Sequence, residues 1–171
     1  MEELKKYIRN IPDFPKKGIL FRDITTLLKN SGKFKEVVDL LHNKYKDAKI
    51  DTIVAAEARG FIIGGALAYK LGCGFVPVRK KGKLPAETIE ATYDLEYGTD
   101  TLCMYKDAIK NREKVLVIDD LLATGGTAKA MCDLVEKTGG KVASLAFIIE
   151  LADLNGKLKL KDYNVFSLII Y

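Results

Sequence analysis

Val115-Leu-Val-Ile-Asp-Asp-Leu-Leu-Ala-Thr-Gly-Gly-Thr127 is the stretch of this chain that decides its fold. Its four leading apolar residues predict a buried strand over 115–118, which is expected to end at Asp119 and Asp120. Apolar periodicity then predicts a helix over about 127–137. The stretch therefore combines a strand, an acidic pair, a glycine turn and the start of a helix.

The glycine turn has the chemistry of an anion site. Gly125 and Gly126 let the backbone approach a ligand, N–H groups at the helix start favour phosphate, and Thr124 and Thr127 add hydroxyl donors. The two carboxylates would repel that phosphate, so we expect them to face ribose hydroxyls or a Mg²⁺ ion. A ribose phosphate would suit both the anion site and the two carboxylates. The alternative interpretation is a buried strand that ends in an N-capped helix, with aspartates that are merely solvated.

Short apolar strands alternate with helices on either side of this stretch. This order predicts an α/β fold with a mainly parallel central sheet flanked by helices, which binds ligands at the carboxyl ends of its strands. Ser31 is expected to cap one helix, and Gly64 and Gly65 to keep another close to the sheet. An antiparallel hairpin around Gly98 is expected to be a mobile flap. Strands are predicted at 52–56, 75–78, 142–149 and 165–170, and helices at 2–9, from 31 and at 61–71.

Length and composition indicate a single globular domain over 1–171. The chain has 171 residues, of which 48% are hydrophobic and 30% are charged, and no apolar run is long enough to span a membrane. Its net charge of +5 comes from scattered Lys and Arg residues, which argues against a nucleic-acid partner but favours capture of a small polyanion. Cys73, Cys103 and Cys132 lack the spacing of disulfides or zinc sites, so reduced thiols and a cytoplasmic location are expected.

Three further segments carry candidate functional residues, each with an ordinary alternative. Arg59 in Glu57-Ala-Arg-Gly-Phe61 follows a strand and could hold a pyrophosphate, or it could be a surface arginine capped by Glu57. Arg79 and Lys83 in Arg79-Lys-Lys-Gly-Lys-Leu-Pro85 could bind an anion or belong to a solvated charge run. Glu96, before a glycine turn, is ordinarily a solvent-facing residue.

Together these motifs resemble those of the type I phosphoribosyltransferases, and several resemble the adenine phosphoribosyltransferases within them. The stretch 115–127 is similar to the signature that binds phosphoribosyl pyrophosphate (PRPP), and 57–61 to the pyrophosphate loop. Phe14-Pro-Lys-Lys-Gly-Ile-Leu-Phe-Arg-Asp-Ile-Thr25 is similar to the hood of the adenine enzymes, and Leu95-Glu-Tyr-Gly98 to their closing flap. The resemblance implies a hood over about 1–30, a flap over about 83–105, Mg²⁺ as cofactor and a homodimer.

The resemblance also implies the reaction, which is transfer of the phosphoribosyl group from PRPP to adenine, giving AMP and pyrophosphate. It implies that Phe21 stacks on the purine, that Leu20 supplies backbone contacts and that Arg22 lines the base pocket. Glu96 and Arg59 are the implied catalytic residues. The implied PRPP- and AMP-binding residues are Arg59, Arg79, Lys83, Tyr97, Asp119, Asp120, Ala123, Thr124, Gly125, Gly126 and Thr127.

Two other functions remain open at this point. Another purine, such as hypoxanthine, guanine or xanthine, could be the acceptor. Leu121, Leu122 and Ala123 stand where hypoxanthine-guanine enzymes carry an acid that faces the purine, which favours adenine. The chain could also be a non-catalytic PRPP-sensing module, although about thirty N-terminal residues leave little room for both a DNA-binding domain and the hood.

Overall fold

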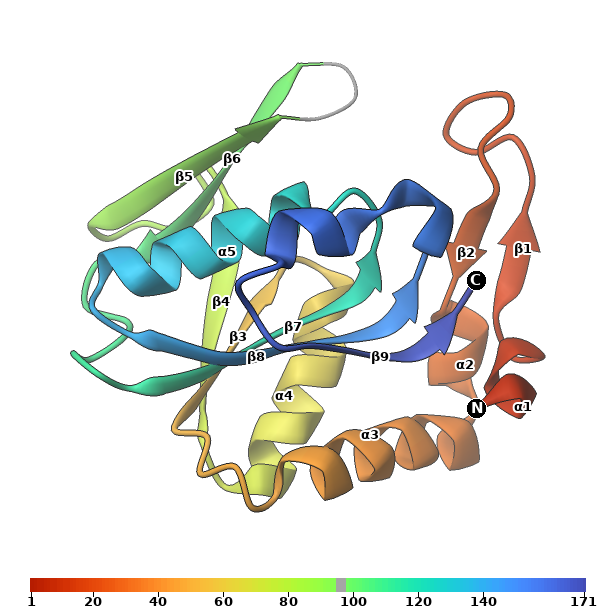
Figure 1. Ribbon diagram of the computed structural model, residues 1–171, viewed down its shortest axis with the longest axis horizontal. Helices are drawn as coiled ribbons and strands as arrows, with labels where there is room; N and C mark the ends of the chain where they lie inside the picture. Colours follow the sequence, from red (N-terminus) through yellow and green to blue (C-terminus); the bar gives the residue numbers. More distant parts are fainter. Residues whose placement is uncertain (95–97) are drawn as a thin grey trace.

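The structure of the chain, a computed structural model, describes residues 1–94 and 98–171 and is built on a central sheet of seven strands (Figure 1). The strand order is β5-β6-β4-β3-β7-β8-β9. Strands β4, β3, β7, β8 and β9 are parallel, and β5 and β6 form an antiparallel extension. The predicted α/β fold with a mainly parallel sheet is therefore confirmed. The strands are β3 Thr52–Ala56, β4 Gly74–Lys80, β5 Thr88–Asp94, β6 Thr99–Tyr105, β7 Lys114–Leu122, β8 Lys141–Glu150 and β9 Val165–Ile170.

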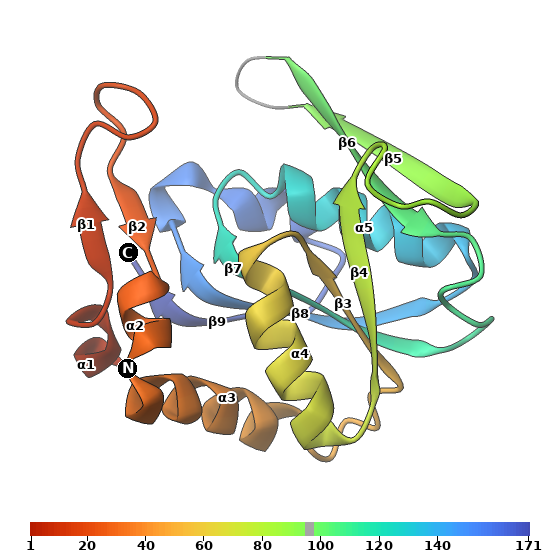
Figure 2. The ribbon, with the colours of Figure 1, turned by 180° about the vertical axis from the view of Figure 1, so that it is seen from behind.

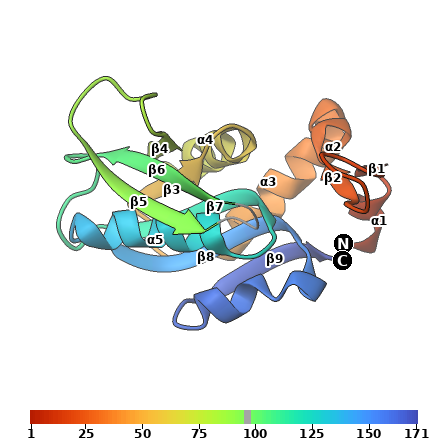
Figure 3. The ribbon, with the colours of Figure 1, turned by 90° about the horizontal axis from the view of Figure 1, so that it is seen from above.

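Helices cover both faces of the sheet, with α3 and α4 on one side and α5 on the other (Figure 3). Side chains of a strand alternate between faces, so Leu116 and Ile118 of β7 join the core beneath α3 and α4. Val115 and Val117 join the core beneath α5, and all four side chains are fully buried. The apolar run of β7 is thus explained by burial on both faces. The helices are α1 Glu2–Lys5, α2 Thr25–Lys29, α3 Ser31–Tyr45, α4 Arg59–Leu71 and α5 Gly126–Lys137, with 3-10 turns η1 Ala152–Leu154 and η2 Gly156–Leu160.

Two antiparallel ribbons stand at opposite ends of the sheet (Figure 2). One is the predicted hairpin of β5 and β6, and the other pairs β1, Arg9–Ile11, with β2, Phe21–Asp23. The helix predicted over 2–9 is therefore wrong in its second half, because Arg9 leaves the helix to pair with Asp23. Their side chains also form an ion pair of 2.6 Å, which holds the ribbon closed.

Other predicted boundaries shift by a few residues for local reasons. The cap of α3 is Asn30 rather than Ser31, since the Asn30 side chain accepts a hydrogen bond from the Lys33 N–H. Strand β7 does not end at the acidic pair but continues to Leu122, which pairs with Glu150 of β8. In the part of the chain that the structure describes, no helix is long and apolar enough to cross a membrane.

The two adjacent glycines of α4 differ in their surroundings, which gives a matched test of packing. A Cβ added at Gly64 would lie 2.8 Å from the Phe75 ring and 3.1 Å from Ile118, whereas one at Gly65 meets nothing within 4 Å. We expect Gly64→Ala to destabilise the fold by about 1–3 kcal/mol through overpacking. Gly65→Ala is expected to stabilise it by about 0.5–1 kcal/mol through helix propensity. Urea unfolding of both variants checks this, and equal effects would contradict it.

Candidate active site

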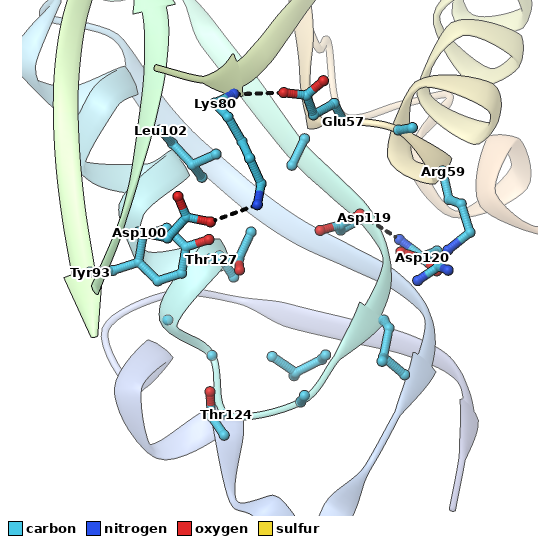
Figure 4. Close-up of a pocket in the computed structure, with 18 residues that line it drawn as sticks. Glu57, Arg59, Lys80, Tyr93, Asp100, Leu102, Asp119, Asp120, Thr124 and Thr127 are labelled. Carbon is cyan, nitrogen blue, oxygen red and sulfur yellow. Dashed lines mark hydrogen bonds and ion pairs between the residues drawn. The ribbon is translucent and has the colours of Figure 1, made fainter. Parts of the chain in front are cut away.

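A cavity of about 450 Å³ lies where the carboxyl ends of β3 and β7 meet (Figure 4). This is the edge of a parallel sheet at which ligands are generally bound. The turn from β3 to α4 and the turn from β7 to α5 form most of its wall, and β4, β5 and β6 contribute the rest. The lining residues are Ala56, Glu57, Ala58, Arg59, Lys80, Tyr93, Asp100, Leu102 and residues 119–128.

The phosphate turn, residues 123–127 at the junction of β7 and α5, has the predicted geometry of a phosphate site. Gly125 is the N-cap of α5 and has a φ of 81°, a left-handed conformation that glycine adopts without strain. Gly126 and Thr127 begin the helix, and the unpaired N–H groups of its first turn border the cavity. All five predicted residues from Ala123 to Thr127 line the cavity, so the turn can receive an anion at a helix N-terminus.

The acidic pair lies beside this turn, in the last part of β7. Asp120 is 6% exposed and its Oδ2 accepts a hydrogen bond from Arg59 Nε at 2.5 Å. Burial, and next the neighbouring Asp120 carboxylate, raise the pKa of Asp119 well above its usual value. A Cβ at Gly60 would lie 2.9 Å from Asp119 Oδ1, so glycine at this position leaves room for the carboxyl. Hydroxyl donors or a cation from a ligand would compensate the charge of Asp119.

Arg59, the first residue of α4, connects the acidic pair with the N-terminal ribbon. Its guanidinium carbon lies 5.2 Å from the ring centroid of Phe21, which in turn makes an edge-to-face contact with Phe14 at 5.1 Å. The alternative of a surface arginine capped by Glu57 is wrong, because Arg59 is half-buried and pairs with Asp120. Arg59 therefore lines the cavity, and its predicted pyrophosphate-binding and catalytic roles stay predictions.

The cations at the end of β4 and just after it lie in two different environments. Arg79 Nη2 lies 3.0 Å from Glu57 Oε2, and neither Arg79 nor Lys83 lines the cavity. The Lys80 N–H, and next the Arg79 guanidinium, lower the pKa of Glu57. Lys80 points into the cavity instead, with its Nζ 3.0 Å from Asp100 Oδ2 (Figure 4). The roles predicted for Arg79 and Lys83 stay predictions.

Lys80, Asp100 and Tyr93 were not predicted from the sequence. Strand β4 runs to Lys80, beyond the predicted end at residue 78, and strand alternation then turns Lys80 away from the side that Arg79 occupies. The hydrogen bond with Lys80 lowers the pKa of Asp100 and raises that of Lys80. Alternation along 79–81 was the one signal in the sequence that could have singled out Lys80.

The residues predicted to bind the base lie in the N-terminal ribbon and do not line the cavity. Leu20 is 44% exposed, and Phe21 approaches the site through Arg59. The Arg22 guanidinium lies 3.8 Å from the ring centroid of Tyr171 and is therefore turned toward the C-terminus. These assignments stay predictions, and Glu96 and Tyr97 lie outside the described residues.

Comparison with known proteins agrees with this geometry. Residues 23–171 match the family described as phosphoribosyl transferase domain. The adenine phosphoribosyltransferase of Brachyspira hyodysenteriae is 62% identical over 169 residues, which cover 99% of either chain. The crystal structure of the adenine phosphoribosyltransferase from Thermoanaerobacter pseudethanolicus is 54% identical, with a TM-score of 0.97 over 99% of each chain.

A more distant structure was solved with ligands. The adenine phosphoribosyltransferase of Saccharomyces cerevisiae, complexed with an imino-altritol bisphosphate and adenine, is 43% identical, with a TM-score of 0.92 over 98% of this chain and 97% of its own. The present chain therefore belongs to the phosphoribosyltransferases, the class of enzyme that its phosphate turn and acidic pair predicted. Within that family it groups with the adenine phosphoribosyltransferases.

Proposed function

We propose that this chain transfers the 5-phosphoribosyl group of PRPP to adenine, giving AMP and pyrophosphate in purine salvage. One observation carries the proposal, which is that the phosphate turn, the acidic pair and Arg59 border a single cavity. The ligand classes that these groups suit are a phosphate, a pair of hydroxyls and a second anion. PRPP contains all three in one molecule.

Each end of PRPP has a matching part of the cavity. The 5'-phosphate is proposed to bind at the turn 123–127, where the first N–H groups of α5 and the threonine hydroxyls donate hydrogen bonds. The ribose hydroxyls would donate to Asp119 and Asp120. Arg59 and Lys80 would hold the pyrophosphate through charge-assisted contacts. To do so, Arg59 would give up its contact with Asp120, and Lys80 its contact with Asp100.

The reaction breaks the bond between the anomeric carbon and pyrophosphate, whose oxygen keeps the electron pair. A purine nitrogen forms the new bond to that carbon, and positive charge develops on the ribose between the two events. The Asp119 and Asp120 carboxylates would stabilise this charge, while Arg59 stabilises the leaving anion. Glu96 is proposed to take the purine proton as the acid/base.

Mg²⁺ is proposed as the cofactor, and the carboxylates of the cavity suit it in part. Among the residues that the structure describes, no group of three or more His, Cys, Asp and Glu side chains could hold a metal. Mg²⁺ commonly binds through one or two carboxylates together with substrate phosphates and water. Asp119 and Asp120 would complete such a set with the diphosphate, and the ion would neutralise charge on the leaving group.

The adenine ring is proposed to bind between this cavity and the N-terminal hood. Phe21 would stack on the purine, Leu20 would supply backbone contacts, and Arg22 and Tyr97 would border the base and the PRPP. The position of Phe21 beside Arg59 supports this assignment, because it brings an aromatic ring next to the proposed pyrophosphate residue.

A single domain over 1–171, a homodimer and a cytoplasmic location complete the proposal. Ile62 and Tyr69, which are 46% and 91% exposed, lie on one side of α4 and would suit burial against a second copy of the chain. Cys73, Cys103 and Cys132 are free thiols, a state that a reducing compartment would maintain.

Labelled purines test the proposed function directly. The purified chain is supplied with PRPP, Mg²⁺ and either adenine, hypoxanthine, guanine or xanthine, and nucleotide formation is followed. AMP from adenine, with little product from the other purines, is the expected result. Absence of AMP would refute the proposal. PRPP binding without turnover of any purine would instead favour a sensing module.

Lys80 and Lys83 provide a matched pair for the pyrophosphate site. Because Lys80 lines the cavity and Lys83 does not, we expect Lys80→Met to raise the KM for PRPP about tenfold. Lys83→Met tests the role predicted for Lys83: a comparable rise would support that role, and a change of less than about twofold would remove Lys83 from the PRPP site. Steady-state kinetics at saturating adenine measure both. A larger effect at Lys83 would support its predicted role and remove Lys80 from the site.

Glu96→Gln separates turnover from binding. If Glu96 handles the purine proton, kcat should fall about 100-fold while the Kd for PRPP stays unchanged. Pre-steady-state kinetics and calorimetry check the two quantities. Full turnover by this variant would rule out the acid/base role.

A further inference from the structure

The phosphate turn is backed by a segment from the C-terminal part of the chain, the 3-10 turn η2. Gly156, its first residue, is buried against the backbone of 122–125. A Cβ added at Gly156 would overlap the carbonyl oxygen of Ala123 and would lie 3.0 Å from Leu122 Cδ1. A Cβ added at Gly125 would in turn lie 2.5 Å from the Gly156 carbonyl oxygen. The two backbones therefore touch with no side chain between them.

Packing, and not backbone conformation, explains the glycine at 156. The glycines with left-handed φ include Gly125 and Gly139, but Gly156 is not one of them. Alanine would thus suit the local backbone of Gly156. What excludes a larger residue is the carbonyl of Ala123, which belongs to the turn that receives the phosphate.

Contacts on both sides hold η2 in place. Leu160, the last residue of η2, is 1% exposed in the core beneath α5. Ahead of η2, the Leu151 N–H donates to the Leu122 carbonyl at 2.9 Å, which ties the chain that leads to η2 to the end of β7. Lys157 Nζ forms an ion pair with Glu150 Oε2 at 2.7 Å. Because Glu150 is 7% exposed and ends β8, this pair ties η2 to the sheet.

We infer that Gly156 is a positioning residue for the 5'-phosphate end of PRPP. It acts through the backbone of 123–125, whose placement sets where the first N–H groups of α5 point. The inference rests on the proposed function, and it predicts a defect confined to one end of the substrate. A larger residue at 156 would displace the phosphate turn but leave Arg59 and Lys80, at the pyrophosphate end, where they are.

Two inhibitors separate the ends of the substrate. Ribose 5-phosphate probes the phosphate turn, and pyrophosphate probes the other end. For Gly156→Ala we expect the inhibition constant of ribose 5-phosphate to rise about tenfold, since small displacements of binding groups are costly. The inhibition constant of pyrophosphate should change by less than about twofold, with the KM for PRPP raised more than kcat is lowered.

Gly139→Ala is the matched control. Gly139 lies just beyond the other end of α5, has a φ of 85°, and a Cβ there would lie 3.0 Å from Asn111 Oδ1. This variant should therefore lose stability without contact to the cavity. Both inhibition constants are expected to match those of the wild type. An equal rise of both constants in Gly156→Ala would indicate general disruption and overturn the inference.

If Gly156→Ala does not fold, Lys157→Met provides a second test of whether η2 positions the phosphate turn. Its side chain is 45% exposed, so the change removes the tie to Glu150 without an overlap, and the ribose 5-phosphate constant should rise about two- to threefold. Wild-type inhibition by ribose 5-phosphate in every variant that folds would overturn the inference. If the wild type makes no AMP, the proposed function fails, and calorimetry with ribose 5-phosphate still tests Gly156.

Discussion

Asp119→Asn is expected to raise the melting temperature of the ligand-free protein while lowering kcat/KM for PRPP about 1000-fold. Burial and Asp120 raise the pKa of Asp119 above its ordinary value of 3.8. A carboxyl whose pKa is raised by folding stabilises the native state below that ordinary value, and this contribution is lost as the pH rises through the folded-state pKa. At neutral pH, above the unfolded-state pKa, this contribution is lost from the folded protein, and asparagine, which does not titrate, avoids the loss.

Thermal unfolding at two pH values measures the stability half of this prediction. At pH 7 the variant should melt a few degrees higher, a modest effect because Asp119 is only half-buried and solvent screens part of its charge. Below about pH 4 the advantage should vanish, since the Asp119 carboxyl is then protonated and uncharged, as the asparagine amide is. Asparagine can still accept the hydrogen bond that the Asp120 N–H donates at 2.9 Å.

The activity half follows from the charge that asparagine lacks. The neutral amide cannot stabilise positive charge on the ribose as a carboxylate does, so kcat/KM should fall although the melting temperature rises. Asp162→Asn, at an exposed position, is the control and should change neither quantity. A variant that melts lower at pH 7 would contradict the electrostatic account, and one that keeps its activity would contradict the ribose assignment.

Arg59→Ala should also lower kcat/KM for PRPP by about 1000-fold or more. The change removes the proposed partner of the pyrophosphate, leaves the buried Asp120 carboxylate without its 2.5 Å contact, and deletes the cation beside Phe21. The inhibition constant of pyrophosphate should rise sharply, whereas that of ribose 5-phosphate should rise less. Steady-state kinetics with both inhibitors check this pattern.

Arg59→Lys and Arg112→Lys complete the experiment. Lysine keeps the charge of arginine but lacks its planar guanidinium. The kcat/KM of Arg59→Lys for PRPP should therefore lie between those of the wild type and Arg59→Ala. Arg112 is exposed and does not line the cavity, so its conversion to lysine should leave kcat/KM unchanged. Near-normal activity of Arg59→Ala would exclude Arg59 from the chemistry.

Features whose causes are local could be predicted from the sequence. The order of the seven strands of the central sheet and of helices α3, α4 and α5 was correct, although β1 and β2 were missed. The turn from β7 to α5 was found because its apolar run, its glycine with positive φ and its helix start are adjacent along the chain. The prediction that β7 ends at the acidic pair failed for a non-local reason. Leu121 and Leu122 remain in the strand because they pair with Ile149 and Glu150 of β8.

The parts of the site that were missed depend on contacts between distant segments. Lys80 matters because β4 continues beside β6, where it pairs with Leu102 and meets Asp100. Gly156 matters because η2 folds back onto the turn after β7. For Lys80 the sequence offers only the alternation along 79–81, inside a run of charges. For Gly156 it offers no signal, since a glycine near the C-terminus is ordinary.

The cations of the cavity are already paired with its own carboxylates, Arg59 with Asp120 and Lys80 with Asp100. Any anion that binds there competes with an internal anion, so net attraction is smaller than the positive charges alone would suggest. A lone inorganic phosphate can replace only one of these carboxylates at a time. A ligand that carries a diphosphate, hydroxyls and a second phosphate replaces several together, so the internal pairs discriminate against the small anions that are abundant in any cell.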